Sequence, residues 1–120
     1  MRNYIRTFKA LSDPNRIRIL KMLEIRQLCV CEITDLLGIS ASTVSQHCSI
    51  LRDAGFILDK KNGKWVDYWL NPSPDDELVK QLLQLLPTWL TDDEVVLSYK
   101  EKVAKADRKI ICCNILLKKG

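Results

Sequence analysis

The chain contains 120 residues, of which 47% are hydrophobic, and it carries a formal net charge of +4. This length suits a single globular domain, and no apolar run is long enough to cross a bilayer, which excludes a membrane-spanning protein. The first residues lack the apolar core of a signal peptide, so the five cysteines are expected to be reduced thiols of a cytoplasmic protein rather than disulfides.

Two helices are predicted at the start of the chain. In the first, apolar residues recur on one helical stripe: Tyr4, Ile5, Phe8 and Leu11. Asp13 followed by Pro14 is typical of a second helix start, because aspartate accepts hydrogen bonds from free backbone N–H groups and proline fits the first turn. Ile17, Leu20 and Leu23 then recur at helical spacing.

A helix-turn-helix is predicted between about residues 31 and 54. A helix that begins near Cys31 should end at Gly38, since glycine commonly terminates helices. Ser40 can cap the next helix, which runs to about Ala54. The short turn between the two helices contains a glycine, as this motif requires.

The helix after Ser40 has two different faces. Val44, Cys48 and Leu51 recur at helical spacing and should face the core, so Cys48 is interpreted as structural. Hydroxyl and amide side chains on the other face can reach base edges and phosphates in the major groove, although the same pattern also suits a merely exposed face. The expected DNA contacts of this helix are Ser42, Thr43, Ser45, Gln46, His47, Ser49 and Arg52. The single histidine, beside the core stripe, is interpreted as an edge-of-core or phosphate-contacting residue rather than a metal ligand.

A β-hairpin is predicted directly after the helix-turn-helix, over about residues 56–70. Two runs rich in β-formers flank the segment 60–64, and this segment contains Asn-Gly, the strongest short-range hairpin signal. A hairpin in this position is a wing. Lys60, Lys61 and Lys64 near its tip are expected to contact phosphates, or alternatively to be solvated turn residues.

Two further helices are expected. Ser73-Pro74 should open one that runs to about Leu86, and a capping box at residues 91–94 should open the last, which runs to about Lys105. The last helix carries a second apolar stripe: Val95, Val96, Tyr99 and Val103. One domain is therefore expected over residues 1–106, followed by a tail at residues 107–120 that is apolar and then basic.

The order and spacing of several motifs resemble the ArsR/SmtB family of winged-helix repressors. They lie at residues 13–20, 28–33, 42–47 and 51–55. The resemblance implies a mainly α fold with a small β-hairpin wing, a winged helix-turn-helix that forms a homodimer through its first and last helices. It also implies binding to double-stranded operator DNA of a resistance operon and release when an inducer binds.

Cys29 and Cys31 lie at the start of the predicted helix-turn-helix. A thiolate pair binds soft metals or metalloids, so this position can couple ligand binding to loss of DNA binding. In an intact helix, residues i and i+2 do not face each other, and the two thiols can meet on one ion only if the helix start unwinds. A helix N-terminus is also expected to lower their pKa.

The family resemblance assigns these cysteines to the arsenic-sensing branch. It implies As(III) or Sb(III), or an organoarsenical, as inducer, bound by three thiolates without any other cofactor. The branch has a third cysteine where this chain has Thr34. Cys112 and Cys113 can supply the missing ligand, form a separate site, or serve as small apolar residues of the tail.

The sequence leaves two other functions open. A redox-sensing repressor would form a disulfide between the two cysteine pairs. A thiol oxidoreductase or soft-metal carrier that does not bind DNA is disfavoured, because the chain contains no Cys-x-x-Cys and no βαβ pattern. Catalysis is not expected, since no nucleotide loop, nucleophile elbow or paired carboxylates occur.

Overall fold

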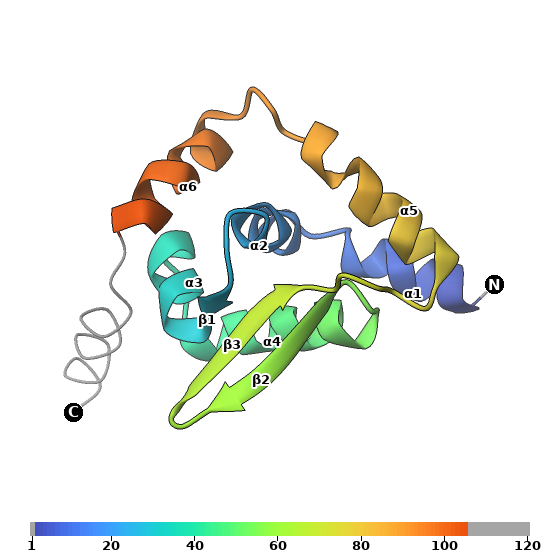
Figure 1. The fold of residues 1–120 in the computed structure, drawn as a ribbon, viewed down its shortest axis with the longest axis horizontal. Coiled ribbons are helices and arrows are strands. Elements are labelled where there is room, and N and C mark those ends of the chain that lie inside the picture. Colours follow the sequence, from blue (N-terminus) through green and yellow to red (C-terminus); the bar gives the residue numbers. More distant parts are fainter. Residues whose placement is uncertain (1, 106–120) are drawn as a thin grey trace.

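The computed structural model describes residues 2–105 and confirms a winged helix-turn-helix (Figure 1). The elements are α1 (Arg2–Ala10), α2 (Pro14–Leu23), β1 (Leu28–Cys29), α3 (Val30–Leu37), α4 (Ala41–Asp53), β2 (Ile57–Asn62), β3 (Trp65–Leu70), α5 (Glu77–Leu85), the 3-10 helix η1 (Leu86–Thr88) and α6 (Glu94–Lys105). Within this range no helix is long and apolar enough to cross a membrane. The predictions for the tail, including those for Cys112 and Cys113, lie outside the described residues.

Side-chain caps fix the boundaries of α2 and the helix-turn-helix. Asp13 accepts hydrogen bonds from the backbone N–H groups of Asn15 (2.7 Å) and Arg16 (3.3 Å). Ser40 Oγ accepts from the N–H of Thr43 at 3.3 Å. Gly38 ends α3 with a φ of 69°, a left-handed conformation that favours glycine. These local signals are the ones that the sequence predicted.

The sheet contains a strand that the sequence did not predict. β2 and β3 form the wing, in which Asn62 pairs with Trp65, so the turn residues are Gly63 and Lys64 and β2 extends farther than expected. The short strand β1 pairs with the other edge of β3, and Cys29 lies opposite Asp67. The three strands therefore join the segment before α3 to the wing.

The core lies between α2, α4 and the sheet. Its members include Ile19, Leu20, Met22, Ile33, Val44, Cys48, Leu51, Phe56, Ile57 and Tyr68. The predicted core stripe of α4 is confirmed, because Val44, Cys48 and Leu51 have no exposed surface. In Figure 1, α2 lies between α4 on one side and the arch formed by α5 and α6 on the other.

The predicted starts of the last two helices are wrong. Asp76 caps α5 by accepting from the N–H groups of Leu78 and Val79, so Ser73-Pro74 lies in the preceding loop. Asp93 Oδ1 accepts from the N–H of Val96 at 3.0 Å at the start of α6, whereas the hydroxyl of Thr91 donates to Asp92. In both cases an aspartate adjacent to the helix, with a strongly accepting carboxylate, provides the cap.

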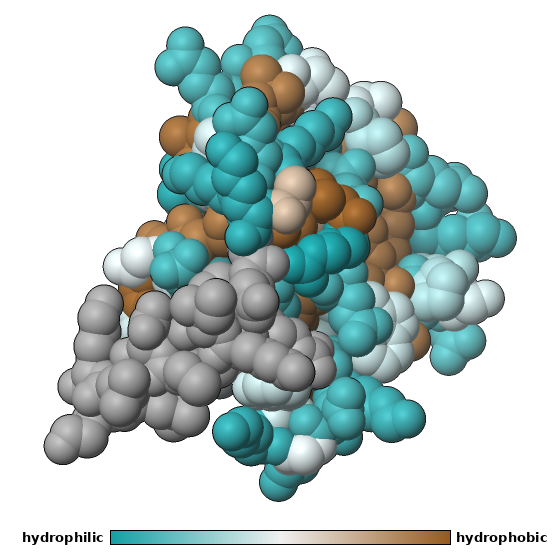
Figure 2. All heavy atoms as spheres, turned by 60° about the vertical axis from the view of Figure 1, so that its left-hand side comes forward, coloured by the Kyte–Doolittle hydropathy of each residue, from teal (hydrophilic) through white to brown (hydrophobic). Residues whose placement is uncertain are grey.

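The two apolar stripes have different surroundings. On α1, Tyr4, Ile5 and Phe8 are 55%, 49% and 53% exposed. On α6, most of the apolar stripe is not available to a second copy, because Val96, Tyr99 and Val103 are buried where α6 packs on α2. The exposed apolar residues of α6 are Val95 and Leu97. Figure 2, with the α3 and α6 side turned forward, shows apolar patches interrupted by polar side chains.

The buried thiol of Cys48 predicts a loss of stability at alkaline pH. Burial raises the pKa of Cys48 to about 12, and its ordinary value is 9.0. Between these values the unfolded chain loses the Cys48 proton while the folded chain keeps it, so stability that is complete below pH 9.0 decreases as pH rises toward 12. The free energy of unfolding, measured with denaturant from neutral to alkaline pH, should fall less steeply in Cys48→Ala than in the wild type. The two slopes should differ by up to about tenfold in the folding equilibrium constant per pH unit. Equal slopes in both proteins would contradict this role of the thiol.

Candidate DNA-reading surface and cysteine site

Helix α4 presents the predicted polar face to solvent. Ser42 and Gln46 are exposed, whereas Thr43, Ser45 and Ser49 are half-buried at the edge of this face. Ser40 Oγ lies 2.8 Å from Thr43 Oγ1 and 3.2 Å from Ser42 Oγ, so the hydroxyls at the start of the helix form a small network. The separation into a polar and a buried face agrees with a helix that enters a groove of DNA.

His47 is held by an arginine that the sequence did not identify. Arg16 Nη1 lies 3.1 Å from His47 Nδ1, and an arginine can only donate, so Nδ1 accepts this hydrogen bond. The same guanidinium donates to the carbonyl oxygens of Ala10 (2.8 Å) and Lys9 (3.0 Å) at the end of α1. Arg16 thus fixes the position of α4 relative to α1. This arrangement favours the edge-of-core interpretation of His47.

Arg52 connects α4, the predicted DNA-reading helix, with the wing. Its Nη1 donates to Asp59 Oδ2 of β2 at 2.8 Å, and its Nε lies 3.4 Å from Asp53 Oδ1. The side chain remains 42% exposed. Its contact with DNA stays a prediction, but its contact with Asp59 already orients α4 against the hairpin.

Lys61 and Lys64 lie next to the tip of the hairpin, and Lys60 pairs with Asp67 one step farther along the strands. Figure 1 shows the tip of this hairpin pointing away from the rest of the fold. Lys60, Lys61 and Lys64 are all exposed. Lys64 Nζ lies 5.9 Å from the centre of the Trp65 ring, within the range of a cation–π contact. These positions are compatible with phosphate contacts.

A basic groove of about 740 Å³ lies beside the reading helix. Its lining includes Arg2, Ile5, Arg6, Lys9, Ser12, Arg16, Ile50 and Asp53. Ile50 and Asp53 follow Gln46 at i+4 and i+7, on the same side of α4. The cations of α1 recur at helical spacing in the sequence, and this pattern could have indicated a second basic surface.

The cysteine pair lies across a strand-to-helix junction. Cys29 ends β1 and is the N-cap of α3 with extended backbone angles, whereas Cys31 is the second residue of the helix. The side chain of Cys29 is 1% exposed, and Cys31 is half-buried. Only one of the two thiols therefore belongs to the helix itself.

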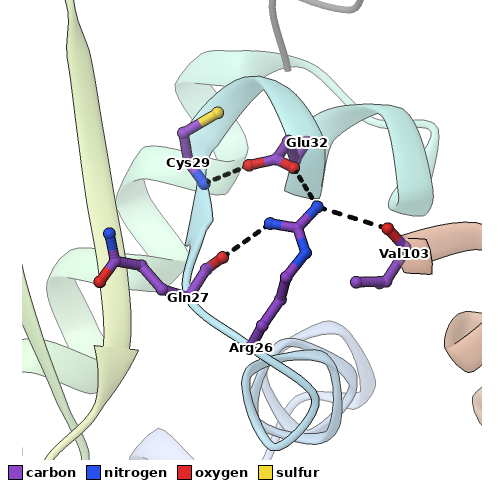
Figure 3. Close-up of polar contacts among 5 residues, drawn as sticks. All are labelled: Arg26, Gln27, Cys29, Glu32 and Val103. Atoms are coloured by element: carbon purple, nitrogen blue, oxygen red, sulfur yellow. Dashed lines mark hydrogen bonds and ion pairs between the residues drawn. The ribbon is translucent and has the colours of Figure 1, made fainter. Parts of the chain in front are cut away.

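A buried carboxylate closes this junction. Glu32 is 1% exposed, and its Oε1 accepts a hydrogen bond from the backbone N–H of Cys29 at 3.1 Å (Figure 3). In return, the backbone N–H of Glu32 faces the Cys29 sulfur, which completes a capping box. Glu32 Oε2 lies 2.6 Å from Arg26 Nη2. Neither charged residue of this arrangement was predicted from the sequence to belong to the site.

The expected lowering of the thiol pKa is wrong for Cys29. Burial raises its pKa to about 11, and the neighbouring Glu32 carboxylate adds to the increase, while the Glu32 N–H opposes it. Loss of hydration disfavours the thiolate more than the helix N-terminus stabilises it. Cys29 is therefore a protonated thiol at neutral pH.

No complete set of three ligands occurs among residues 2–105. Within this part of the chain, no group of three histidine, cysteine or acidic side chains is placed to hold one ion. Cys48 is enclosed in the core. Thr34 Oγ1, one helical turn after Cys31, is buried without a hydrogen-bond partner in the described chain. A third sulfur would have to come from outside the described residues.

Known proteins share both sequence and fold with this chain. A family model described as "Bacterial regulatory protein, arsR family" matches residues 13–58. The arsenic resistance transcriptional regulator ArsR2 of Pseudomonas putida is 36% identical over 88% of this chain and 94% of its own length. The chain belongs to the ArsR family. The arsenical resistance operon repressor of Escherichia coli is 34% identical over 90% of this chain and 94% of its own length.

Solved structures agree with this assignment. HlyU from Vibrio cholerae has a TM-score of 0.59 and 31% identity, over 72% of this chain and 89% of that chain. A homodimeric winged helix-turn-helix DNA-binding domain, Mb0332 of Mycobacterium bovis, shares the fold with a TM-score of 0.59 at 24% identity, over 72% of this chain and 76% of that chain. This ArsR-family chain is accordingly a DNA-binding transcriptional regulator and not an enzyme.

The geometry predicts a division between sequence-specific and sequence-independent contacts. Gln46→Ala should weaken binding to the operator by about 1 to 3 kcal/mol and binding to random DNA much less, because base contacts carry the specificity. Lys61→Ala should weaken both similarly and reduce the logarithmic salt slope by about one unit. Fluorescence anisotropy on both DNAs over a salt series measures these effects. If the two variants behave alike, this division is incorrect.

Proposed function

We propose that this ArsR-family regulator is a metalloid-responsive repressor of a resistance operon. In the reduced, inducer-free state it binds operator DNA, and it leaves the operator when As(III), Sb(III) or an organoarsenical binds the thiolates of Cys29 and Cys31. The observation that carries the proposal is the position of this pair, at the junction between a strand of the wing sheet and the helix that supports the reading helix. The names of the Pseudomonas putida and Escherichia coli relatives support the same inducer class.

The mechanism follows from what surrounds the two thiols. Cys29 is extended at the N-cap and Cys31 is helical, and we propose that the first turn of α3 reorganises when their sulfur atoms share one ion. That turn contacts two DNA-binding elements, because β1 pairs with β3 of the wing and α3 packs on α4. Inducer binding therefore shifts both elements from the arrangement that fits the operator.

The raised pKa of Cys29 is compatible with binding of arsenite. Arsenite is a neutral trihydroxide, and each As–S bond replaces one As–O bond while the thiol proton leaves with the hydroxide as water. No oxidation state changes in this exchange, and no free thiolate has to accumulate beforehand. For the third sulfur we propose Cys112 or Cys113, with a separate site or a packing role in the tail as the alternatives.

Redox sensing is less well supported by the surroundings of Cys29. Oxidants react with thiolates that are accessible to solvent. Cys29 is 1% exposed, and burial keeps its pKa near 11. An operator-release assay that compares arsenite with peroxide distinguishes the two functions.

We further propose that the protein acts as a homodimer through α1. Tyr4, Ile5 and Phe8 form an exposed apolar face, and its burial against a second copy would be favourable by about 25 cal/mol per Å². Val95 and Leu97 of α6 are additional exposed apolar residues. Mb0332, a protein of the same fold, is homodimeric.

A charge on α1 tests this interface. Phe8→Glu should shift the protein toward a mass near that of one chain, 13.8 kDa, and weaken operator binding, because a carboxylate would be buried without a partner. The matched control is Leu85→Glu, since Leu85 is 51% exposed but lies on α5. Light scattering at micromolar concentration measures the mass. A wild-type protein that is already monomeric would contradict the dimer.

Single thiol substitutions test the sensor. Cys29→Ser and Cys31→Ser should bind the operator but no longer release it with arsenite, because one sulfur ligand is lost while α4 is intact. Cys48→Ser should remain inducible with a lower free energy of unfolding, by about 1 to 3 kcal/mol, since a hydroxyl replaces the thiol in the core. Anisotropy of labelled operator during arsenite titration gives the response.

The tail cysteines provide the second half of this test. If Cys112→Ser combined with Cys113→Ser leaves induction unchanged, the tail does not supply the third ligand. If the double variant is unresponsive while Cys29→Ser responds normally, the sensor is in the tail and the assignment to Cys29 and Cys31 is wrong.

A further inference from the structure

Arg26 connects two segments that are far apart in the sequence. It lies between α2 and β1, and Figure 3 shows its guanidinium directed between the start of α3 and the end of α6. Nη2 contacts Glu32 Oε2 at 2.6 Å and the carbonyl oxygen of Val103 at 3.3 Å, while Nη1 donates to the carbonyl oxygen of Gln27 at 2.9 Å. One side chain thus touches both the thiol-bearing helix and the last turn of α6.

The position of Glu32 depends on both of its partners. Its carboxylate is 1% exposed, and a buried charge is unfavourable unless it is paired and hydrogen-bonded. One oxygen accepts from the Cys29 N–H and the other pairs with Arg26. A movement of Cys29 away from Glu32 therefore changes the group that holds Arg26 in place.

We propose that Arg26 is a positioning residue that transmits the state of the cysteine turn to α6. This inference rests on the proposed function, because it requires an inducer that draws Cys29 toward Cys31. As the turn reorganises, the Cys29 N–H leaves Glu32, the carboxylate moves, and Arg26 loses its place against the Val103 carbonyl. The last turn of α6 is then released from the α3 side of the molecule.

Loosening of α6 would reach the rest of the regulator through its packing. Tyr99 and Val103 are buried in the contact of α6 with α2, and α2 also packs on the reading helix α4. The inducer signal thus has a second route, separate from the direct contacts of β1 with β3 and of α3 with α4. Arg26 is the residue that distinguishes this route, because it bonds α6 directly.

Amide hydrogen exchange on the full-length protein tests the relay. In the wild type, arsenite should increase exchange several-fold in the last turns of α6, around residues 99–105, because this segment loses its contact with Arg26. In Arg26→Gln, the same segment should exchange as fast without arsenite as the inducer-bound wild type does, and arsenite should change it little. Arsenite should still bind this variant, as measured by calorimetry, because both thiols remain.

Two further variants make the test specific. Arg26→Lys retains the charge but lacks the forked donor, so it should also fail to transmit the change to α6. Lys100→Gln removes an exposed charge from α6 and should respond like the wild type. A relay through Arg26 is overturned if α6 exchange is the same with and without arsenite in a wild type that releases its operator, or if Arg26→Gln transmits the change fully. If arsenite does not bind the wild type at all, the proposed function fails and the relay with it.

Discussion

The buried carboxylate of Glu32 makes the interactions on which the strand-to-helix junction at Cys29 depends. It caps α3, fixes the backbone of Cys29 and neutralises Arg26, all within a side chain that is 1% exposed. Removing one partner of a buried charge is strongly destabilising, so these contacts form and break together. In the proposed mechanism, these contacts are lost when the inducer rearranges the strand-to-helix junction.

Different contacts, made by two arginines, position α4, the predicted DNA-reading helix. Arg16 ties His47, in the middle of α4, to the end of α1, and Arg52 ties the last turn of α4 to Asp59 of the wing. These arginine contacts lie on opposite sides of the buried stripe that anchors α4 in the core. These contacts hold α4 against α1 and the wing, so a movement of either element would be transmitted to α4.

Local sequence signals predicted much of this fold. Asp13, Gly38 and Ser40 determine helix ends through contacts within a few residues, and the core stripe with Cys48 follows from helical spacing alone. Features set by distant partners escaped prediction. The two-residue strand β1 exists because β3 is beside it, and the contact of Arg26 with Val103 joins residues 77 positions apart. The candidate thiols were found by their spacing, but the pKa of Cys29 depends on burial, which spacing does not reveal.

In the proposed mechanism, an inducer cannot reach Cys29 while the turn is closed, because this side chain has almost no exposed surface. Capture must then begin at the more accessible Cys31 or wait for a spontaneous opening of the turn. If opening comes first, the rate of induction rises with inducer concentration only until it equals the opening rate, and it stays constant above that concentration. The closed turn would in this way limit the rate of induction, because the maximum rate would be set by the protein and would not depend on the amount of inducer.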